Sequence, residues 1–264
     1  MGKRKSVFIT GAANGIGRAC AEHFVSRGWL VGACDISQDG IASLVAELGE
    51  DACWGGQLDV TDYEAWEREL AAFAEVAGGI DVLLNNAGIL TSGSFQSIPP
   101  TAHHAVMNVN VNGVMNGCHA AFPYLQRSKG CTINMASASA IYGQPDIASY
   151  SSSKFAVRGL TEGLNLEWEP YGIRVVDIWP LFVQTNMVSG MKSRAIKKMG
   201  VKLVPEDVAK VVFEAANGSG MSKVHWLVGA VTRLYAPLVG VVPTWATRQI
   251  NKKLTGMNEE PVSD

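Results

Sequence analysis

Short apolar runs alternate with longer segments of helical periodicity, and this alternation restricts the fold more than any other feature of the sequence. The apolar runs cover residues 7–9, 29–34, 53–58, 82–84, 130–135 and 173–178, and the helical segments cover residues 16–27, 40–48, 63–77, part of 101–126, 150–169 and 205–217. Strands separated by helices of this length form βαβ units and a parallel sheet. Because the strands are almost entirely apolar, helices must cover both faces. We therefore expect an α/β fold, a doubly wound sandwich with a mainly parallel sheet.

The length and charge of the chain fit one domain that acts on a small molecule. Its 264 residues show no internal repeat, low-complexity linker or charge block, so we expect a single domain over residues 1–264. With 22 Lys and Arg residues against 24 Asp and Glu residues, the net charge is −2. A chain this close to neutral lacks the broad basic surface of a nucleic-acid-binding protein. The basic residues 1–5 are expected to form a solvated tail, and no apolar run typical of a signal peptide follows them.

The cysteines and histidines indicate a reducing compartment and no metal site. The chain has five cysteines: Cys20, Cys34, Cys53, Cys118 and Cys131. Their odd number, the lack of a CxxC pair and their apolar surroundings are typical of buried free thiols in a cytoplasmic protein. The one close histidine pair, His103-His104, has no carboxylate or cysteine at a spacing that would complete a zinc or iron site. We expect a cytoplasmic protein without a bound metal.

An apolar segment within residues 224–250 stands apart from the alternating pattern. Its centre, residues 234–247, carries no charge but is interrupted by Pro237 and Pro243. It is also shorter than the roughly 20 apolar residues that a membrane-spanning helix needs, so no transmembrane segment is expected. The segment could pack in the core, form an oligomer contact, line a substrate pocket or touch a membrane surface.

The first strand runs directly into a glycine-rich turn, residues 10–17 (TGAANGIG), and a helix follows. Gly11 permits the tight turn, Gly15 lets a pyrophosphate approach the backbone, and Gly17 lets helix and strand pack closely. The N-terminus of the helix then offers free N–H groups and a positive dipole end to phosphates. The turn therefore predicts a dinucleotide site that includes Asn14 and Ile16.

An acidic residue, Asp35, follows the second strand, 18 positions beyond Gly17. A carboxylate here can accept hydrogen bonds from both hydroxyls of the adenosine ribose, and it repels the 2′-phosphate of NADP. Residues 36–38 contain no Arg that could bind such a phosphate. NAD is therefore the expected cofactor. Two alternatives stay open: Asp35 could only cap the next helix, and Arg18 could either touch the pyrophosphate or remain in solvent.

Tyr150 and Lys154 lie four positions apart at the start of a predicted helix. Residues with this spacing share a helix face, so the phenol and the ammonium can share one pocket. A free tyrosine has a pKa of about 10 and is no base near neutral pH. A neighbouring lysine cation and an oxidised nicotinamide both favour the phenolate. The pair predicts a site for acid–base chemistry.

Together these motifs resemble those of the short-chain dehydrogenase/reductase family, with its YxxxK signature. The resemblance covers residues 5–217 and rests on residues 10–17, Asp59-Val60, residues 85–88 (NNAG), Asn110, Ser137, and Tyr150 with Lys154. It implies a sheet of about seven strands and an oxidoreductase that moves a hydride between a nicotinamide and an alcohol or ketone. Helices 150–169 and 205–217 correspond to the family's subunit contacts, which implies a homo-oligomer, a tetramer or a dimer.

The resemblance also implies roles for individual residues. Asp59 and Val60 are expected to flank the adenine ring. Asn86, Ala87 and Gly88 are expected to line the floor of the cofactor site. Asn110 would anchor a water in a proton relay to Lys154, which would also bind the nicotinamide ribose. Beyond the sixth strand, Val183 would offer its backbone to the carboxamide, and Thr185 would supply a hydroxyl to the carboxamide or the pyrophosphate.

Two serines compete for the catalytic role. Ser137 and Ser139 both follow the strand at residues 130–135. In the family the serine most often lies thirteen positions before the tyrosine, which favours Ser137. Ser137 would hold the substrate oxygen beside Tyr150, and Ser139 would border the substrate, although a catalytic Ser139 stays open.

The substrate is expected to be a lipophilic secondary alcohol or ketone, such as a steroid, retinoid, aryl or aliphatic compound. Residues 186–204 contain Met187, Met191 and Met199 beside several lysines, a composition that suits an amphipathic substrate lid. Two other functions stay open: an NADPH-dependent ketoreductase of acyl-type substrates, and a catalytically idle NAD-binding regulatory protein.

Overall fold

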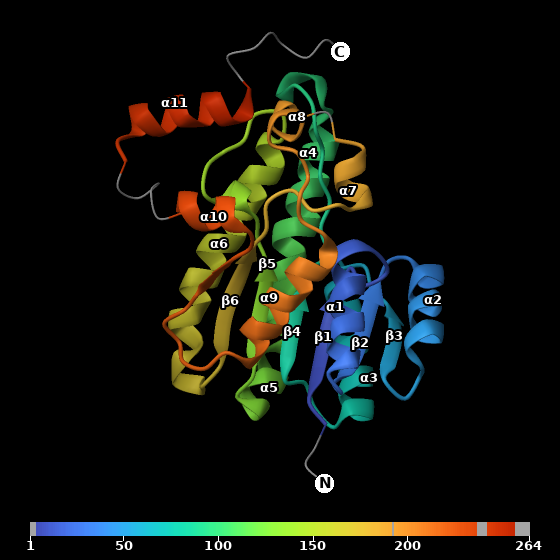
Figure 1. The fold of residues 1–264 in the computed structure, drawn as a ribbon. Coiled ribbons are helices and arrows are strands. Elements are labelled where there is room, and N and C mark those ends of the chain that lie inside the picture. The colour runs from blue at the N-terminus through green and yellow to red at the C-terminus, as the bar shows by residue number, and fades with distance from the viewer. Residues whose placement is uncertain (1–3, 192, 237–241, 257–264) are drawn as a thin grey trace.

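One sheet of seven parallel strands forms the centre of the molecule, in the order β3-β2-β1-β4-β5-β6-β7 (Figure 1). The computed structural model describes residues 4–191, 193–236 and 242–256. The strands are β1 (Ser6–Thr10), β2 (Leu30–Asp35), β3 (Cys53–Gln57), β4 (Val82–Asn85), β5 (Cys131–Met135), β6 (Arg174–Trp179) and β7 (His225–Leu227). The expected α/β sandwich is confirmed, and every strand pair in the sheet is parallel.

Helices cover both faces of the sheet, as the apolar strands require. They are α1 (Gly15–Ser26), α2 (Gln38–Leu48), α3 (Tyr63–Ala77), α4 (Pro100–Met107), α5 (Gly113–Ser128), α6 (Ala148–Trp168), α7 (Asn186–Ser189), α8 (Arg194–Met199), α9 (Pro205–Asn217), α10 (Ala230–Tyr235) and α11 (Thr244–Thr255). Val7 and Ile9 of β1 pack toward α1, α2 and α9. Phe8 points to the opposite face and packs with residues of α3, α5 and α6. Successive strand side chains alternate between faces, so each face has its own core.

Two segments differ in detail from the expected elements. The helical pattern in residues 101–126 is not one helix: α4 and α5 are separated by a wider π-helical turn at Asn108–Asn112. The region 224–250 contributes β7, a short strand at the edge of the sheet that the sequence pattern did not indicate. The same region contributes α10 and α11, while its residues 237–241 lie outside the described residues. In the described part of the chain, no helix has the length and hydropathy needed to span a membrane.

The strand order reverses between β1 and β4, and this reversal positions the functional site. From β1 the chain proceeds outward to β2 and β3, then returns to β4 on the other side of β1. Loops leaving the carboxyl ends of β1 and β4 therefore diverge and leave a crevice, the usual ligand position in such sheets. Figure 1 shows α7, α8 and α11 at this same end of the sheet.

Candidate active site

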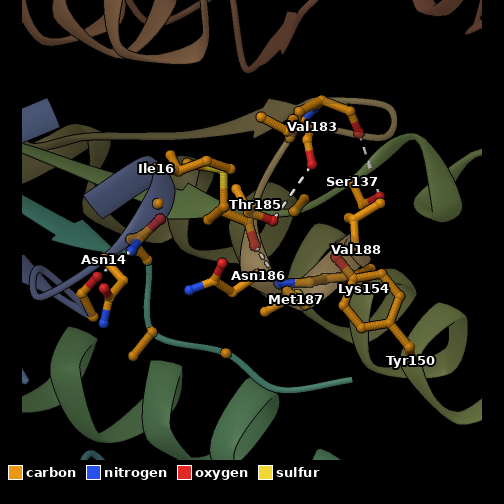
Figure 2. Close-up of a pocket in the computed structure, with 18 of the residues that line it drawn as sticks. Asn14, Ile16, Ser137, Tyr150, Lys154, Val183, Thr185, Asn186, Met187 and Val188 are labelled. Carbon is orange, nitrogen blue, oxygen red and sulfur yellow. Dashed lines mark hydrogen bonds between the residues drawn. The ribbon is translucent and has the colours of Figure 1, made fainter. Parts of the chain in front are cut away.

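A cavity of about 250 Å³ lies at the carboxyl ends of β1, β4, β5 and β6. Its lining includes Gly11, Asn14, Gly15, Ile16, Asp35, Asn86, Ala87, Gly88, Ser137, Tyr150, Lys154, Val183 and Thr185. Figure 2 shows Asn14 and Ile16 on one side and Ser137, Tyr150 and Lys154 on the other. The fold thus gathers most of the residues singled out by sequence around one hollow.

The three glycines of the turn between β1 and α1 occupy positions that do not accommodate a larger residue. Gly11 and Gly15 have φ angles of +66° and +55°, which favour glycine. A Cβ atom on Gly17 would lie 2.1 Å from the carbonyl oxygen of Gly11. Asn14 precedes α1 without capping it through its side chain, so the first N–H groups of the helix stay available to a ligand. The turn fits the diphosphate of a dinucleotide.

Asn86 and Thr10 hold the glycine turn against the strand on the other side of the reversal. The side-chain amide of Asn86 donates to the carbonyl oxygens of Thr10 (2.9 Å) and Gly11 (3.1 Å). The hydroxyl oxygen of Thr10 accepts the N–H groups of Asn86 and Ala87, both at 3.1 Å. Asn86 therefore lines the floor of the cavity while its side-chain N–H groups bind the protein backbone.

Asp35 lies at the carboxyl end of β2 and faces the cavity. Its two carboxylate oxygens accept the N–H groups of Ala13 (3.1 Å) and Ser37 (3.0 Å), which fix the orientation of the side chain. Each oxygen keeps a free lone pair for a ligand hydroxyl. The alternative that Asp35 caps the next helix is wrong, because Ser37 caps α2 by accepting the N–H of Gly40. Asp35 is thus free to bind a ligand.

A second, smaller cavity of about 190 Å³ adjoins Asp35 on the side of the outer strands. Asp59 and Val60 line it, as expected for an adenine pocket, together with Gly11, Ala87 and Gly88. Arg18 lines neither cavity and pairs instead with Glu22 and Glu47. The position of Arg18 therefore does not support the alternative in which it touches the pyrophosphate.

A buried hydrogen-bond chain positions α6, which carries Tyr150 and Lys154. The side-chain amide of Asn85 on β4 donates to Asn134 on β5 (2.9 Å), and the amide of Asn134 donates to Thr161 on α6 (3.0 Å). All three side chains are buried. Buried side-chain hydrogen bonds of this kind favour one arrangement of the elements that they join. The helix that carries the catalytic pair is therefore fixed to the central strands.

Burial sets the protonation of Tyr150 and Lys154. It raises the pKa of the Tyr150 phenol to about 12, and an interaction with the Ser137 hydroxyl opposes this rise. Burial lowers the pKa of the Lys154 ammonium to about 8, so the lysine remains largely charged at pH 7. Its Nζ donates to the carbonyl oxygen of Met135 at 2.6 Å and lies 5.4 Å from the centre of the Tyr150 ring. This is a phenol with a cation beside it.

Ser137 and Ser139 occupy different positions relative to the cavity. Ser137 lines it, and its Oγ accepts the backbone N–H of Ser139 at 3.1 Å. The Ser139 hydroxyl is buried behind Ser137, 3.3 Å from its Oγ, and does not line the cavity. Ser137 is therefore the serine placed to meet a ligand beside Tyr150.

Asn110 lies beneath the cavity within the π-helical turn. Its Oδ1 accepts the N–H of Ile89 (2.8 Å), and its Nδ2 donates to the Ile89 carbonyl (2.9 Å) and the Ser153 hydroxyl (3.0 Å). The side chain is fully buried. Asn110 thus connects the loop after β4 to α6, one residue from Lys154.

The expected lid, residues 186–204, contains α7 and α8 and covers one side of the cavity. Met187 and Val188 line it, whereas Met191 and Met199 are half-buried and Lys197 and Lys198 are exposed. This distribution matches the expected amphipathic character. Whether the lid moves stays a prediction.

An ion pair that sequence reasoning missed connects the lid to the catalytic loop. Arg194, the first residue of α8, donates from its guanidinium to both carboxylate oxygens of Asp146, at 2.9 and 3.2 Å, and from its backbone N–H to one of them. Asp146 has a φ of +65°, and its carbonyl oxygen accepts the N–H of Gly93. Asp146 therefore joins the lid, the loop after β4 and the loop between Ser137 and Tyr150.

The cysteines are buried, as their apolar surroundings in the sequence indicated. All five cysteines are buried free thiols. Among the described residues, no group of three or more His, Cys, Asp or Glu side chains is arranged to hold a metal ion.

Comparison with known proteins places these observations in a family. A model described as short chain dehydrogenase matches residues 5–195. The chain is 34% identical over 214 residues to meso-2,3-butanediol dehydrogenase of Serratia marcescens, covering 79% of this chain and 85% of that protein. It is 33% identical over 196 residues to trans-4-hydroxycyclohexanecarboxylate dehydrogenase of Sinomonas cyclohexanicum, covering 71% and 76%.

A solved structure agrees with these relatives. The 3-ketoacyl-(acyl-carrier-protein) reductase from Brucella melitensis, complexed with NADH, matches with a TM-score of 0.79 at 25% identity, covering 85% of this chain and 96% of that one. The family's enzymes are oxidoreductases that bind a nicotinamide cofactor, and the glycine turn and flanking cavities described above fit that group. This chain belongs to the short-chain dehydrogenase/reductase family.

Proposed function

We propose that this protein is an NAD-dependent dehydrogenase or reductase acting on a secondary alcohol or its ketone. The observation that carries the proposal is the convergence of Ser137, Tyr150 and Lys154 on the cavity that also contains Asp35. The nicotinamide, when bound, supplies the hydride acceptor or donor. The protein side chains bind the substrate oxygen, move its proton and hold the cofactor.

Tyr150 is the proposed acid and base, and Lys154 tunes it. In alcohol oxidation the Tyr150 phenolate accepts the hydroxyl proton, and the Ser137 hydroxyl donates a hydrogen bond to the same oxygen. Lowering the phenol pKa from about 12 to near 7.5 requires roughly 6 kcal/mol of preference for the phenolate. The Lys154 cation and the positive charge of an oxidised nicotinamide supply interactions of the right sign. Asn110 is proposed to anchor a water that relays the proton to Lys154.

Asp35 is the basis for proposing NAD rather than NADP. Lys154, at the other end of the site, is the sole cation among the described residues that line the two cavities. A 2′-phosphate would meet the Asp35 carboxylate without a compensating charge. We expect Asp35→Ser to reduce the ratio of kcat/KM for NAD over NADP by about ten-fold to a hundred-fold, because a charge-assisted hydrogen bond and a repulsion are both lost. Asp39→Ser, an exposed acid on α2, is the matched control. A native preference for NADP would contradict the assignment.

The proposed substrate is lipophilic, since Leu181, Met187 and Val188 form an apolar wall of the cavity. A relative named for a hydroxylated cyclohexane carboxylate supports a secondary alcohol on an apolar ring. We expect NAD-linked turnover of a panel of secondary alcohols, with kcat/KM rising roughly ten-fold from small polyols to aryl, terpenoid or steroid alcohols. The absorbance of NADH, followed at a fixed protein concentration, measures the turnover of each alcohol. A preference for small polyols would refute the lipophilic substrate, and no turnover at all would favour an idle NAD-binding protein.

A second candidate is a ketoreductase of acyl-type substrates, favoured by the structural match to a 3-ketoacyl reductase. In that case the protein would reduce a 3-ketoacyl thioester faster than any simple ketone. Offering a 3-ketoacyl thioester and a simple ketone together in the reductive direction shows which of them the protein reduces faster, and this distinguishes the two functions.

We also propose that the protein is a homo-oligomer, a tetramer or a dimer. Two large apolar side chains on α6 are exposed: Phe155 (41%) and Leu166 (70%). By contrast, the exposed residues of α9 are charged or polar, so α6 is the better candidate for a subunit contact. We expect light scattering at micromolar concentration to give a mass of two or four chains, and Leu166→Glu to lower it. A stable native monomer would contradict the proposal. The five buried free thiols support a reducing compartment, the cytoplasm.

A further inference from the structure

The Asp146–Arg194 ion pair lies outside the cofactor cavity, and nothing in the proposed reaction uses it. Neither residue lines the cavity, yet the pair connects α8 of the lid to the loop that leads into α6 and Tyr150. The Asp146 and Arg194 side chains are 10% and 17% exposed, which makes this the least exposed Arg–carboxylate pair among the described residues. Such a pair is screened less than a surface pair, and its two parallel hydrogen bonds add strength.

The backbone of Asp146 separates what the turn needs from what the carboxylate does. Asp146 has a φ of +65°, a conformation that suits glycine best. The turn is held by the Asp146 carbonyl oxygen, which accepts the N–H of Gly93 at 2.8 Å, and this bond needs no side chain. Within the described residues, the carboxylate accepts hydrogen bonds from Arg194 alone. The acidic side chain therefore serves the contact with α8 and not the turn.

A buried hydroxyl opposes the position that α8 occupies. Ser193, directly before Arg194, is 2% exposed, and its Oγ has no hydrogen-bond partner. Ser193 stands at the N-cap position of α8, but its side chain does not cap the helix. Burying a hydroxyl without a partner is unfavourable, and water would satisfy it if α8 moved outward. The ion pair therefore holds α8 in place against this cost.

Glycines flank α8 on both sides. Gly190 precedes the helix and Gly200 follows it; both are exposed, and a Cβ atom on either would meet no atom within 4 Å. Beyond Gly200 the chain is anchored, because the N–H of Gln184 donates to the carbonyl oxygen of Leu203 at 2.9 Å. Small residues at the ends of an element often serve as hinges. The glycines therefore allow α8 to swing while the anchored segment stays in place.

We propose that Asp146 is a positioning residue that fastens α8 over the substrate end of the site by holding Arg194. With the pair formed, α8 shields the bound alcohol or ketone from water. With the pair broken, α8 swings out about its flanking glycines and the substrate leaves sooner. The kinetic part of this inference rests on the proposed dehydrogenase function, whereas the fastening of α8 does not.

Limited trypsin digestion of the full chain, without cofactor or substrate, tests the fastening without any turnover. Trypsin cleaves after Lys and Arg, and α8 carries the exposed Lys197 and Lys198, whose cleavage requires the helix to leave its position. Asp146→Asn removes the charge and leaves every trypsin site in place. We expect it to raise the cleavage rate in α8 by about ten-fold, because a charge-assisted pair is lost. Ser193→Ala removes the unpaired hydroxyl and should lower that rate.

A second ion pair provides the control for the digestion. Glu47→Gln breaks the exposed Arg18–Glu47 pair and should leave cleavage in α8 unchanged. Mass spectrometry identifies the cut, and NADH binding verifies that each variant is folded, since α8 supplies no residue to the cofactor cavity. The proposal is overturned if Asp146→Asn is cleaved in α8 no faster than the wild type, or if Glu47→Gln has the same effect as Asp146→Asn.

Steady-state kinetics with cyclohexanol and NAD then test the positioning role. We expect Asp146→Asn to raise KM by about ten-fold while kcat stays within about two-fold, because the fastened lid retains the substrate and takes no part in proton transfer. Ser193→Ala should lower KM. A loss of kcat with unchanged KM would overturn the proposal, because Asp146 would then act on Tyr150 and not on the lid.

The two measurements distinguish failure of this proposal from failure of the proposed function. If no form of the protein oxidises cyclohexanol or any other alcohol of the panel, yet Asp146→Asn is cleaved faster in α8, the proposed function is wrong and the fastening stands. If turnover is normal and cleavage is unchanged in Asp146→Asn, the fastening is wrong and the proposed function stands.

Discussion

Tyr150→Phe should lower kcat by on the order of 10³-fold while leaving NADH binding nearly unchanged. The substitution removes only the hydroxyl that is proposed to exchange a proton with the substrate, and general acid–base catalysis contributes effects of this size. The ring remains, so its packing in the cavity and the position of Lys154, 5.4 Å from the ring centre, should persist. Steady-state rates and fluorescence titration with NADH measure the two effects separately.

Serine variants provide the control for this prediction. Ser137→Ala removes the hydroxyl that lines the cavity and should reduce kcat by about a hundred-fold. Ser139→Ala removes a hydroxyl buried behind it and should leave kcat within a few-fold of wild type. If Ser139→Ala is the more damaging change, Ser139 is the catalytic serine. If Tyr150→Phe retains wild-type turnover, the proposed acid–base role is wrong.

The sequence was sufficient for the central strands β1, β4, β5 and β6, because burial on both faces of the sheet requires a continuous apolar run. It was not sufficient for β7, His225–Leu227, whose three residues are only half-buried at the sheet edge. It also did not indicate the break in residues 101–126. Asn108–Asn112 continues the helical path, and only the wider turn, with Asn110 buried against backbone groups of the loop after β4, distinguishes it.

The candidate site likewise contains some features that the sequence predicts and others that it does not. Tyr150 and Lys154 are four positions apart on one helix, so local geometry alone predicts that they share a pocket. The Asp146–Arg194 ion pair joins residues 48 positions apart, and no periodicity connects them. A groove between the start of α6 and α11 depends on where α11 docks, which is decided by tertiary packing. A single sequence does not predict such contacts between distant segments.

Lys154→Met should reduce kcat by on the order of 10³-fold and, at the same time, stabilise the protein. Catalysis suffers because the phenol pKa, already raised to about 12 by burial, loses the cation that favours the phenolate. NADH binding should weaken as well, since Lys154 is proposed to contact the nicotinamide ribose. These losses follow from the position of the ammonium in the cavity.

The gain in stability follows from the pKa of Lys154. Burial lowers it from 10.5 to about 8, which costs the folded state about 3 kcal/mol while the amine is charged. Below pH 8 both folded and unfolded chains carry the proton, so the cost is full. Between pH 8 and 10.5 the unfolded chain binds more protons at Lys154 than the folded chain does. The free energy of unfolding of the wild type therefore rises with pH in this range.

The variant lacks that cost but also lacks the charge-assisted hydrogen bond to Met135, which is worth about 1.5–3 kcal/mol. We therefore expect Lys154→Met to raise the free energy of unfolding by up to about 1.5 kcal/mol at pH 7. The difference should shrink as the pH rises toward 10. Denaturant unfolding at pH 7 and pH 9.5, without added NAD(H), measures it. Lys210→Met, an exposed lysine on α9, should show neither effect. If Lys154→Met is less stable than wild type at pH 7, the interpretation that Lys154 is retained for catalysis at the expense of stability is wrong.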